Sequence, residues 1–169
     1  RVTEGYGPNL PALLKLKNEG CSLVITVDCG TSAFEPLQGA QDAKLDVLVI
    51  DHHEAEANLP PAVAVVNPNR QDETREFSSL AAVGVVFLVL VALNRRLRES
   101  GWFADKALRK PNLMAMLDLV ALGTVCDVVQ LSGLNRAYVS QGVKVLAKRQ
   151  NPGIVALSDV SKLSEKPDS

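Results

Sequence analysis

The hydrophobic positions in the first 66 residues fall into short continuous runs that polar and chain-breaking residues separate. Two runs, Ser22–Val27 and Val47–Ile50, have the length of buried strands, and helical segments precede them at Leu10–Asn18 and Ala33–Lys44. Continuous runs of this length, without strict alternation, are typical of parallel strands with helices on both faces. A third run, Ala62–Val66, lies between proline-containing breakers, so the pattern predicts an α/β fold with a parallel sheet flanked by helices.

The rest of the chain has longer apolar patterns, which favour helices. The predicted helices are Leu80–Glu99, Asn112–Leu122, Asn135–Lys148 and Ile154–Val160. We expect Ser79 to cap the first of them, as we expect Ser32 to cap the helix that follows the first strand. Gly123 is the expected end of the second. Residues 1–160 therefore form one domain with a helical second part, and residues 161–169 form a polar tail or linker.

Composition and charge narrow the classes of protein. An apolar content of 47% in 169 residues is enough for a substantial core, and a formal net charge of −1 argues against a surface that binds nucleic acid over its whole extent. The longest apolar run, Leu80–Leu93, is shorter than the roughly 20 residues of a membrane span, so no membrane association is expected. Three cysteines without CxxC spacing indicate reduced thiols in a cytoplasmic protein.

Three aspartates stand where apolar runs end: Asp28, Asp51 and Asp127. The carboxyl ends of parallel strands meet at one edge of a sheet, so at least two of these carboxylates should lie together there. The only two histidines, His52 and His53, follow Asp51 directly. Imidazoles beside carboxylates suit Mn²⁺, with Mg²⁺ or Co²⁺ as alternatives. Taken singly, each aspartate also fits a capping role, and the histidine pair also fits a solvated turn.

The triplet Asp51-His52-His53 resembles the signature of the DHH phosphoesterase superfamily. Three flanking stretches resemble further motifs in the expected order: RVTEGYGPN at Arg1–Asn9, VDCGTSA at Val27–Ala33 and LDLVALGTVCDVVQL at Leu117–Leu131. NPNR at Asn67–Arg70, AVGV at Ala82–Val85 and GLNR at Gly133–Arg136 extend the match. The first stretch favours the RecJ-like branch of the family, and the fold that the resemblance implies is a Rossmann-like sheet followed by a helical segment.

The resemblance also implies a role for each candidate residue. Asp28 would bridge two metal ions, and His52 and Asp127 would hold the second ion. His53 would contact the scissile phosphate, while Asp51 would orient a histidine without binding metal itself. Two arginines, Arg1 and Arg136, are candidates for binding a substrate phosphate. The catalytic set is therefore Asp28, Asp51, His52, His53 and Asp127.

The implied activity is Mn²⁺- or Mg²⁺-dependent hydrolysis of phosphodiesters by a two-metal site, in a 5′–3′ exonuclease specific for single-stranded DNA that acts in DNA repair and recombination. A helicase and a single-strand-binding protein are the implied partners. We expect the first family motif, of the Asp-x-Asp-x-x-Gly type, to precede Arg1 in a longer protein and a further domain to follow residue 169, so that this stretch alone is inactive. The alternatives are another DHH phosphoesterase, acting on oligonucleotides or cyclic dinucleotides, and a non-catalytic DHH-like scaffold.

Overall fold

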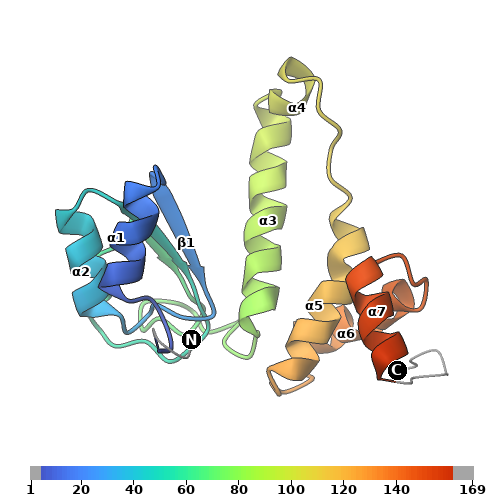
Figure 1. The fold of residues 1–169 in the computed structure, drawn as a ribbon. Coiled ribbons are helices and arrows are strands. Elements are labelled where there is room, and N and C mark those ends of the chain that lie inside the picture. The colour runs from blue at the N-terminus through green and yellow to red at the C-terminus, as the bar shows by residue number, and fades with distance from the viewer. Residues whose placement is uncertain (1–4, 162–169) are drawn as a thin grey trace. The chain divides into compact units, whose positions relative to one another are not determined.

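The structure, a computed structural model, describes residues 5–161 and divides the chain into two compact units, up to Val86 and from Phe87 onward. The elements of the first unit are α1 (Leu10–Asn18), β1 (Leu23–Val27), α2 (Phe34–Asp42), β2 (Asp46–Ile50) and β3 (Ala64–Val66). Helix α3 (Ala82–Glu99) begins in the first unit and continues into the second. The second unit goes on with α4 (Trp102–Asp105), the 3₁₀ helix η1 (Leu113–Met116), α5 (Leu117–Cys126), α6 (Gly133–Leu146) and α7 (Pro152–Val160) (Figure 1).

The three strands form a parallel sheet in the order β1-β2-β3. Val27 pairs with Ile50, and Ile50 pairs with Val66, so the three strands end in register. The next residues along the chain are Asp28, Asp51 and Asn67, and they consequently share one edge of the sheet. The predicted parallel α/β sheet is confirmed, and its carboxyl edge carries a polar residue after every strand.

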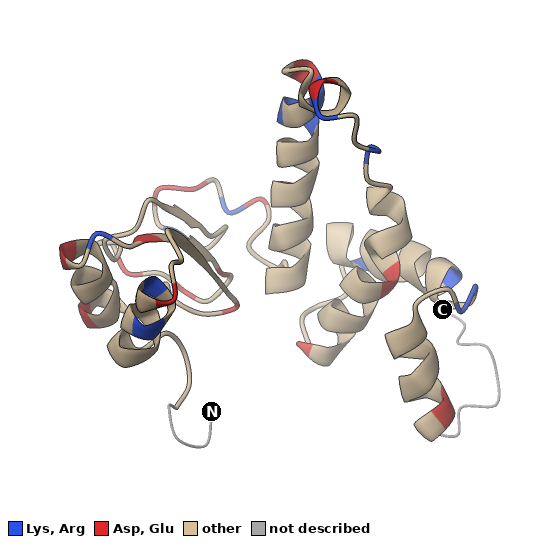
Figure 2. Cartoon of the chain, turned by 45° about the horizontal axis from the view of Figure 1, so that its top comes forward, with Lys and Arg blue, Asp and Glu red and all other residues tan. Residues whose placement is uncertain are grey.

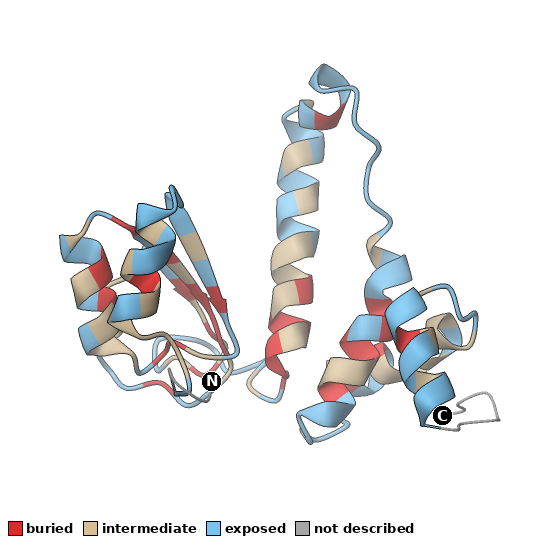
Figure 3. Cartoon of the chain, viewed as in Figure 1, coloured by how far each residue is buried: buried red, intermediate tan, exposed pale blue. Residues whose placement is uncertain are grey.

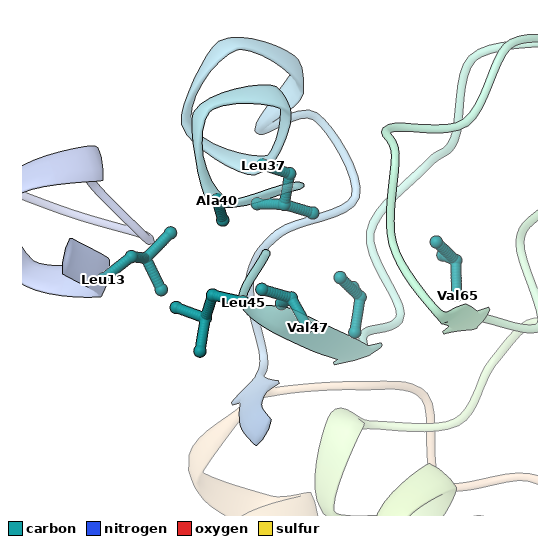
Figure 4. Packing of buried hydrophobic residues seen from close by; sticks show 7 residues of the cluster. Leu13, Leu37, Ala40, Leu45, Val47 and Val65 are labelled. Atoms are coloured by element: carbon teal, nitrogen blue, oxygen red, sulfur yellow. The ribbon is translucent and has the colours of Figure 1, made fainter. Parts of the chain in front are cut away.

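One face of the sheet is covered by α1 and α2. The core on this face consists of Leu13 from α1, Leu37 and Ala40 from α2, Leu45, and the strand residues Val47, Val49 and Val65 (Figure 4). On the opposite face, Leu23, Ile25 and Val27 of β1 are about half exposed. Cover by helices, which the apolar runs predicted for both faces, is therefore present on one face among the described residues of the first unit.

Helix α1 matches its predicted bounds, and its local chemistry explains why. The side chain of Asn9 accepts a hydrogen bond from the Ala12 amide at 2.9 Å, and a proline occupies the first turn. At the other end Gly20 adopts φ +97°, and the amide of Cys21 donates to the carbonyl of Leu16. Such a left-handed glycine ends a helix at little cost.

Three predicted helix ends are wrong. Helix α2 has Ala33, not Ser32, at its N-cap position and no side-chain cap, and α3 begins at Ala82, three residues after Ser79. Gly123 does not end α5, which runs on to Cys126, because tertiary packing overrides the weak helix propensity of glycine. Thr124, one residue later, is fully buried within this helix.

In the second unit α5 and α6 pack closely. Tyr138 of α6 also contacts Phe87 edge-to-face, with ring centroids 5.4 Å apart. Burial along α3 is concentrated in its first turns, and the far end is exposed (Figure 3). None of the helices among residues 5–161 combines the length and the apolar character that crossing a bilayer requires. Lys and Arg are interspersed with Asp and Glu along both units (Figure 2).

Gly142 makes the close approach of α5 and α6 possible. A Cβ atom at this position would lie 2.2 Å from the carbonyl oxygen of Leu117 and 2.4 Å from the Cβ of Ala121. We predict that Gly142→Ala lowers the free energy of unfolding by about 1–3 kcal/mol, because the helices must separate to admit one methyl group. Urea denaturation followed by circular dichroism measures this.

The control is Gly153→Ala in α7, where the nearest atom to an added Cβ is Asn151 Oδ1 at 3.5 Å. Alanine favours helix over glycine, so this variant should be as stable as the parent or slightly more stable. Equal loss of stability in both variants would contradict the packing argument.

Candidate metal centre

The site lies at the carboxyl edge of the sheet and is built by the residues that follow β1 and β2. Asp28 has φ +62°, in the left-handed region that Asp tolerates better than most non-glycine residues. Its amide donates to the carbonyl of Ile50 at 3.0 Å, which extends the ladder one residue beyond the strand. Its own carbonyl accepts from the Tyr6 hydroxyl at 2.8 Å. The backbone is thereby held while the carboxylate, 52% exposed, projects from the edge.

Asp51 is 1% exposed, and its carboxylate is surrounded by donors. Oδ2 accepts from the Thr31 amide at 3.0 Å, and Oδ1 accepts from the amides of His52 and His53 at 2.8 and 3.3 Å. Oδ1 also lies 2.7 Å from Nδ1 of the His53 ring. Burial raises the pKa of Asp51, but the hydrogen bonds from His53, Thr31 and His52 outweigh it and lower the pKa to about 2.

The two imidazoles have defined tautomers because their Nδ1 partners can only accept. Nδ1 of His52 lies 3.0 Å from the carbonyl oxygen of Leu80, and Nδ1 of His53 faces the ionised Asp51. Both Nδ1 atoms therefore carry a proton. In a neutral ring this leaves the lone pair on Nε2, which is the form in which histidine binds metal.

Two of the predicted ligands, Asp28 and His52, come together with His53, which was predicted to contact the substrate phosphate. Ligand atoms of Asp28, His52 and His53 all lie within 4.8 Å of one another. Nε2 of His52 is 3.2 Å from Oδ1 of Asp28, so a lone pair faces a carboxylate oxygen unless a proton or a cation lies between them. Two adjacent ligands at about 2.1 Å from one octahedral ion are about 3 Å apart, so this donor set fits a divalent cation.

The remaining predicted site residues are placed as follows. Asp127 is exposed at the C-cap of α5, and Arg136 is exposed in the first turn of α6, both in the second unit. Their convergence with the cluster of the first unit stays a prediction. Arg1 lies outside the described residues, as does the tail after Ser161.

Two asparagines for which no individual role was predicted hydrogen-bond the backbone carbonyls of the two histidines. Nδ2 of Asn67 donates to the carbonyl of His53 at 2.8 Å and to Oγ1 of Thr31 at 2.9 Å. Nδ2 of Asn69 donates to the carbonyl of His52 at 2.5 Å and to that of Ser78 at 3.1 Å. The sequence position of Asn67 could have indicated this role, because Asn67 follows β3 directly, as Asp28 and Asp51 follow β1 and β2.

Comparison with known proteins identifies the family. Residues 2–124 match the model described as "DHH family, N-terminal domain". The chain belongs to the DHH family. It is 43% identical over 162 residues to the single-stranded-DNA-specific exonuclease RecJ of Dickeya dadantii, an alignment that covers 95% of this chain and 28% of the relative. RecJ of Bacillus subtilis is 36% identical over 161 residues, with 95% and 19% covered.

Two solved structures resemble the chain. A crystal structure of exonuclease RecJ bound to manganese matches with a TM-score of 0.75 and 31% identity, over 95% of this chain and 38% of that one. RecJ in complex with Mn²⁺ from Thermus thermophilus matches with a TM-score of 0.69 and 30% identity, over 89% and 21%. The chain spans less than a third of the length of the curated relatives named above.

The hydrogen bonds of Asp51 predict that its carboxylate is needed for the first unit to fold. In Asp51→Asn the new amide group would present donors to the Thr31, His52 or His53 donors, and the ionic character of every bond would be lost. We expect the free energy of unfolding to fall by about 2–3 kcal/mol. Chemical denaturation at neutral pH measures it.

Asp46→Asn is the matched control, because Asp46 begins the same strand that Asp51 follows and is exposed. Its stability should change by about 0.5 kcal/mol or less. A similar loss in both variants would mean that strand β2, and not the buried carboxylate, sets the effect.

Proposed function

We propose that the protein containing this chain is a metal-dependent exonuclease that hydrolyses single-stranded DNA from the 5′ end. The observation that carries the proposal is the convergence of Asp28, His52 and His53 at the carboxyl edge of the sheet. Two further findings support it: the relatives named as single-stranded-DNA-specific exonucleases match 95% of the chain, and a structural neighbour is RecJ bound to manganese. Roles in DNA repair and recombination, a cytoplasmic location, and partnership with a helicase and a single-strand-binding protein belong to the same proposal.

The surroundings of Asp28, His52 and His53 support their proposed roles, whereas the roles of Asp127, Arg1 and Arg136 rest on the family resemblance. Asp28, whose carboxylate is half exposed, would be a ligand common to both metal ions. His52, whose ring Nδ1 bonds the Leu80 carbonyl, would hold the second ion together with Asp127. His53, whose Nδ1 is held by Asp51, contacts the scissile phosphate, and Arg1 and Arg136 bind substrate phosphates. When bound, Mn²⁺ or Mg²⁺ ions neutralise the phosphodiester and lower the pKa of the attacking water.

Asp51 acts through His53. Because the carboxylate stays ionised at neutral pH, it keeps the Nδ1 proton on the ring and stabilises the imidazolium form if the ring gains a second proton. The ring orientation is then fixed before substrate arrives, which limits the reorganisation that the reaction requires.

The activity test uses the complete protein with Mn²⁺ and single-stranded DNA that carries a 5′ phosphate. We expect mononucleotides to be released from the 5′ end. Asp28→Ala should lower kcat/KM by at least a hundredfold, because even the loss of a residue that hydrogen-bonds a metal ligand lowers activity or metal affinity about 10–100-fold. Asp46→Ala, on the same sheet but at the start of a strand, serves as the control with unchanged activity. Preference for duplex DNA or for pyrophosphate would overturn the proposed substrate.

Substitution of His53 and substitution of His52 should affect different quantities, namely turnover and Mn²⁺ affinity. His53→Ala is expected to lower kcat by about 10²–10³-fold, the size of a lost contact to developing charge, with a smaller change in Mn²⁺ affinity. His52→Ala is expected to weaken Mn²⁺ binding more strongly. Calorimetric titration with Mn²⁺ and steady-state kinetics measure the two quantities, and the reverse order of effects would exchange the two roles.

A further inference from the structure

A pocket adjoins the Asp28–His52–His53 cluster in the first unit. It has a volume of about 390 Å³, and Asp51 and His53 border it on the side of the cluster. Residues 6–8, which precede α1, and Pro36 in the first turn of α2 also line it. If a substrate phosphate lies at the cluster, the chemical group next to that phosphate would occupy this pocket.

Tyr6 is the aromatic residue of this pocket, and it is both exposed and held. Its side chain is 63% exposed, although Tyr is usually at least partly buried. Its hydroxyl donates to the carbonyl of Asp28 at 2.8 Å, across 22 positions of sequence. One end of the ring is thus anchored beside the cluster while much of its surface stays open to solvent. An anchored aromatic ring loses little conformational entropy when a ligand stacks on it.

The composition of the pocket decides which part of a nucleotide it suits. Its described lining contains no lysine or arginine. The described lining therefore offers no cationic side chain of lysine or arginine to pair with a phosphate. Apart from Tyr6, Asp51 and His53, the lining consists of two prolines, two glycines and the small residues Cys29, Ser32 and Ala33. A flat, uncharged ring with a π face fits such a surface.

We propose that Tyr6 is the stacking platform for a nucleobase that adjoins the scissile phosphodiester, which rests on the nuclease function proposed above. Pro8 and Pro36 complete the apolar walls around the base. Aromatic stacking tolerates every base because each has a π face, so the pocket provides affinity for a nucleotide without selecting its sequence. The hydroxyl of Tyr6 serves to keep the ring in place through Asp28 and makes no contact with the base.

The experiment compares Tyr6→Leu with Tyr6→Phe in the complete protein, with KM for 5′-phosphorylated single-stranded DNA as the measurement. Tyr6→Leu removes the π face and should raise KM about 5- to 100-fold, the range of base–aromatic stacking, with kcat changed less. Tyr6→Phe keeps the ring and should stay within about threefold of the parent. Because Tyr6 is exposed, neither substitution is expected to prevent folding.

Phe77→Leu is the matched control, since Phe77 is an exposed aromatic residue of the same unit that does not line the pocket. A second arm uses DNA whose terminal nucleotide lacks its base. The parent should show the same rise in KM for this substrate, and Tyr6→Leu should show no additional rise. Fluorescence of a terminal 2-aminopurine, quenched on binding to the parent and not to Tyr6→Leu, gives a readout independent of turnover.

Failure of this inference is distinguishable from failure of the proposed function. If the parent protein does not degrade single-stranded DNA, the nuclease proposal is wrong. If it degrades the abasic and the normal substrate equally well, or if Tyr6→Phe is as impaired as Tyr6→Leu, the stacking role is wrong and the nuclease proposal stands. In the last case the hydroxyl bond to Asp28 would be the contribution of Tyr6.

Discussion

A buried carboxylate at the end of β2 determines the shape of the candidate site. Removing a carboxylate from water costs several kcal/mol, and the cost is offset only when hydrogen-bond donors replace the lost water. Asp51 obtains these donors from three backbone amides and one imidazole, and two of the amides belong to the residues that follow it directly. The chain must therefore curl around its own side chain, and this turn places His52 and His53 at the edge of the sheet.

The backbone carbonyls of His52 and His53 also need hydrogen-bond donors, because they lie beyond the end of β2 and have no partner in the sheet. Buried carbonyls also need partners, and the side-chain amides of Asn67 and Asn69 supply them. Asn69 is itself positioned by its backbone amide, which donates to Oδ1 of Asn67 at 2.8 Å. The third strand thus contributes to the site through the two asparagines after it. These hydrogen bonds hold the backbone of His52 and His53, so their rings can move only by rotation about the side-chain bonds. The contacts of the two rings with the Leu80 carbonyl and the Asp51 carboxylate restrict that rotation.

The sequence predicted those features that depend on the nature and spacing of neighbouring residues. Apolar runs located all three strands and the bounds of α1, whose ends the local contacts of Asn9 and Gly20 explain, since caps act within a single turn. The histidine pair after Asp51 pointed to the cluster for the same local reason. The roles of Asn67 and Thr31 depend on a contact between residues 36 positions apart, and nothing in the local pattern specifies which donor reaches which acceptor over that separation. Gly123 failed as a helix end because packing of α5 against α6 outweighs about 1 kcal/mol of helix propensity.

Asp28 and Asp51 occupy equivalent positions after neighbouring strands, yet their surroundings suit them to opposite roles. Three donors converge on Oδ1 of Asp51, and Oδ2 accepts from the Thr31 amide in a residue that is only 1% exposed. A cation bound there would have to displace a hydrogen bond that stabilises the fold. Asp28 is held instead through its backbone, by Ile50 and Tyr6, so its half-exposed carboxylate is available to exchange water for a metal ion without loss of those bonds. The burial and hydrogen bonds of Asp51 therefore support Asp28 as the ligand and Asp51 as the residue that orients the adjacent imidazole.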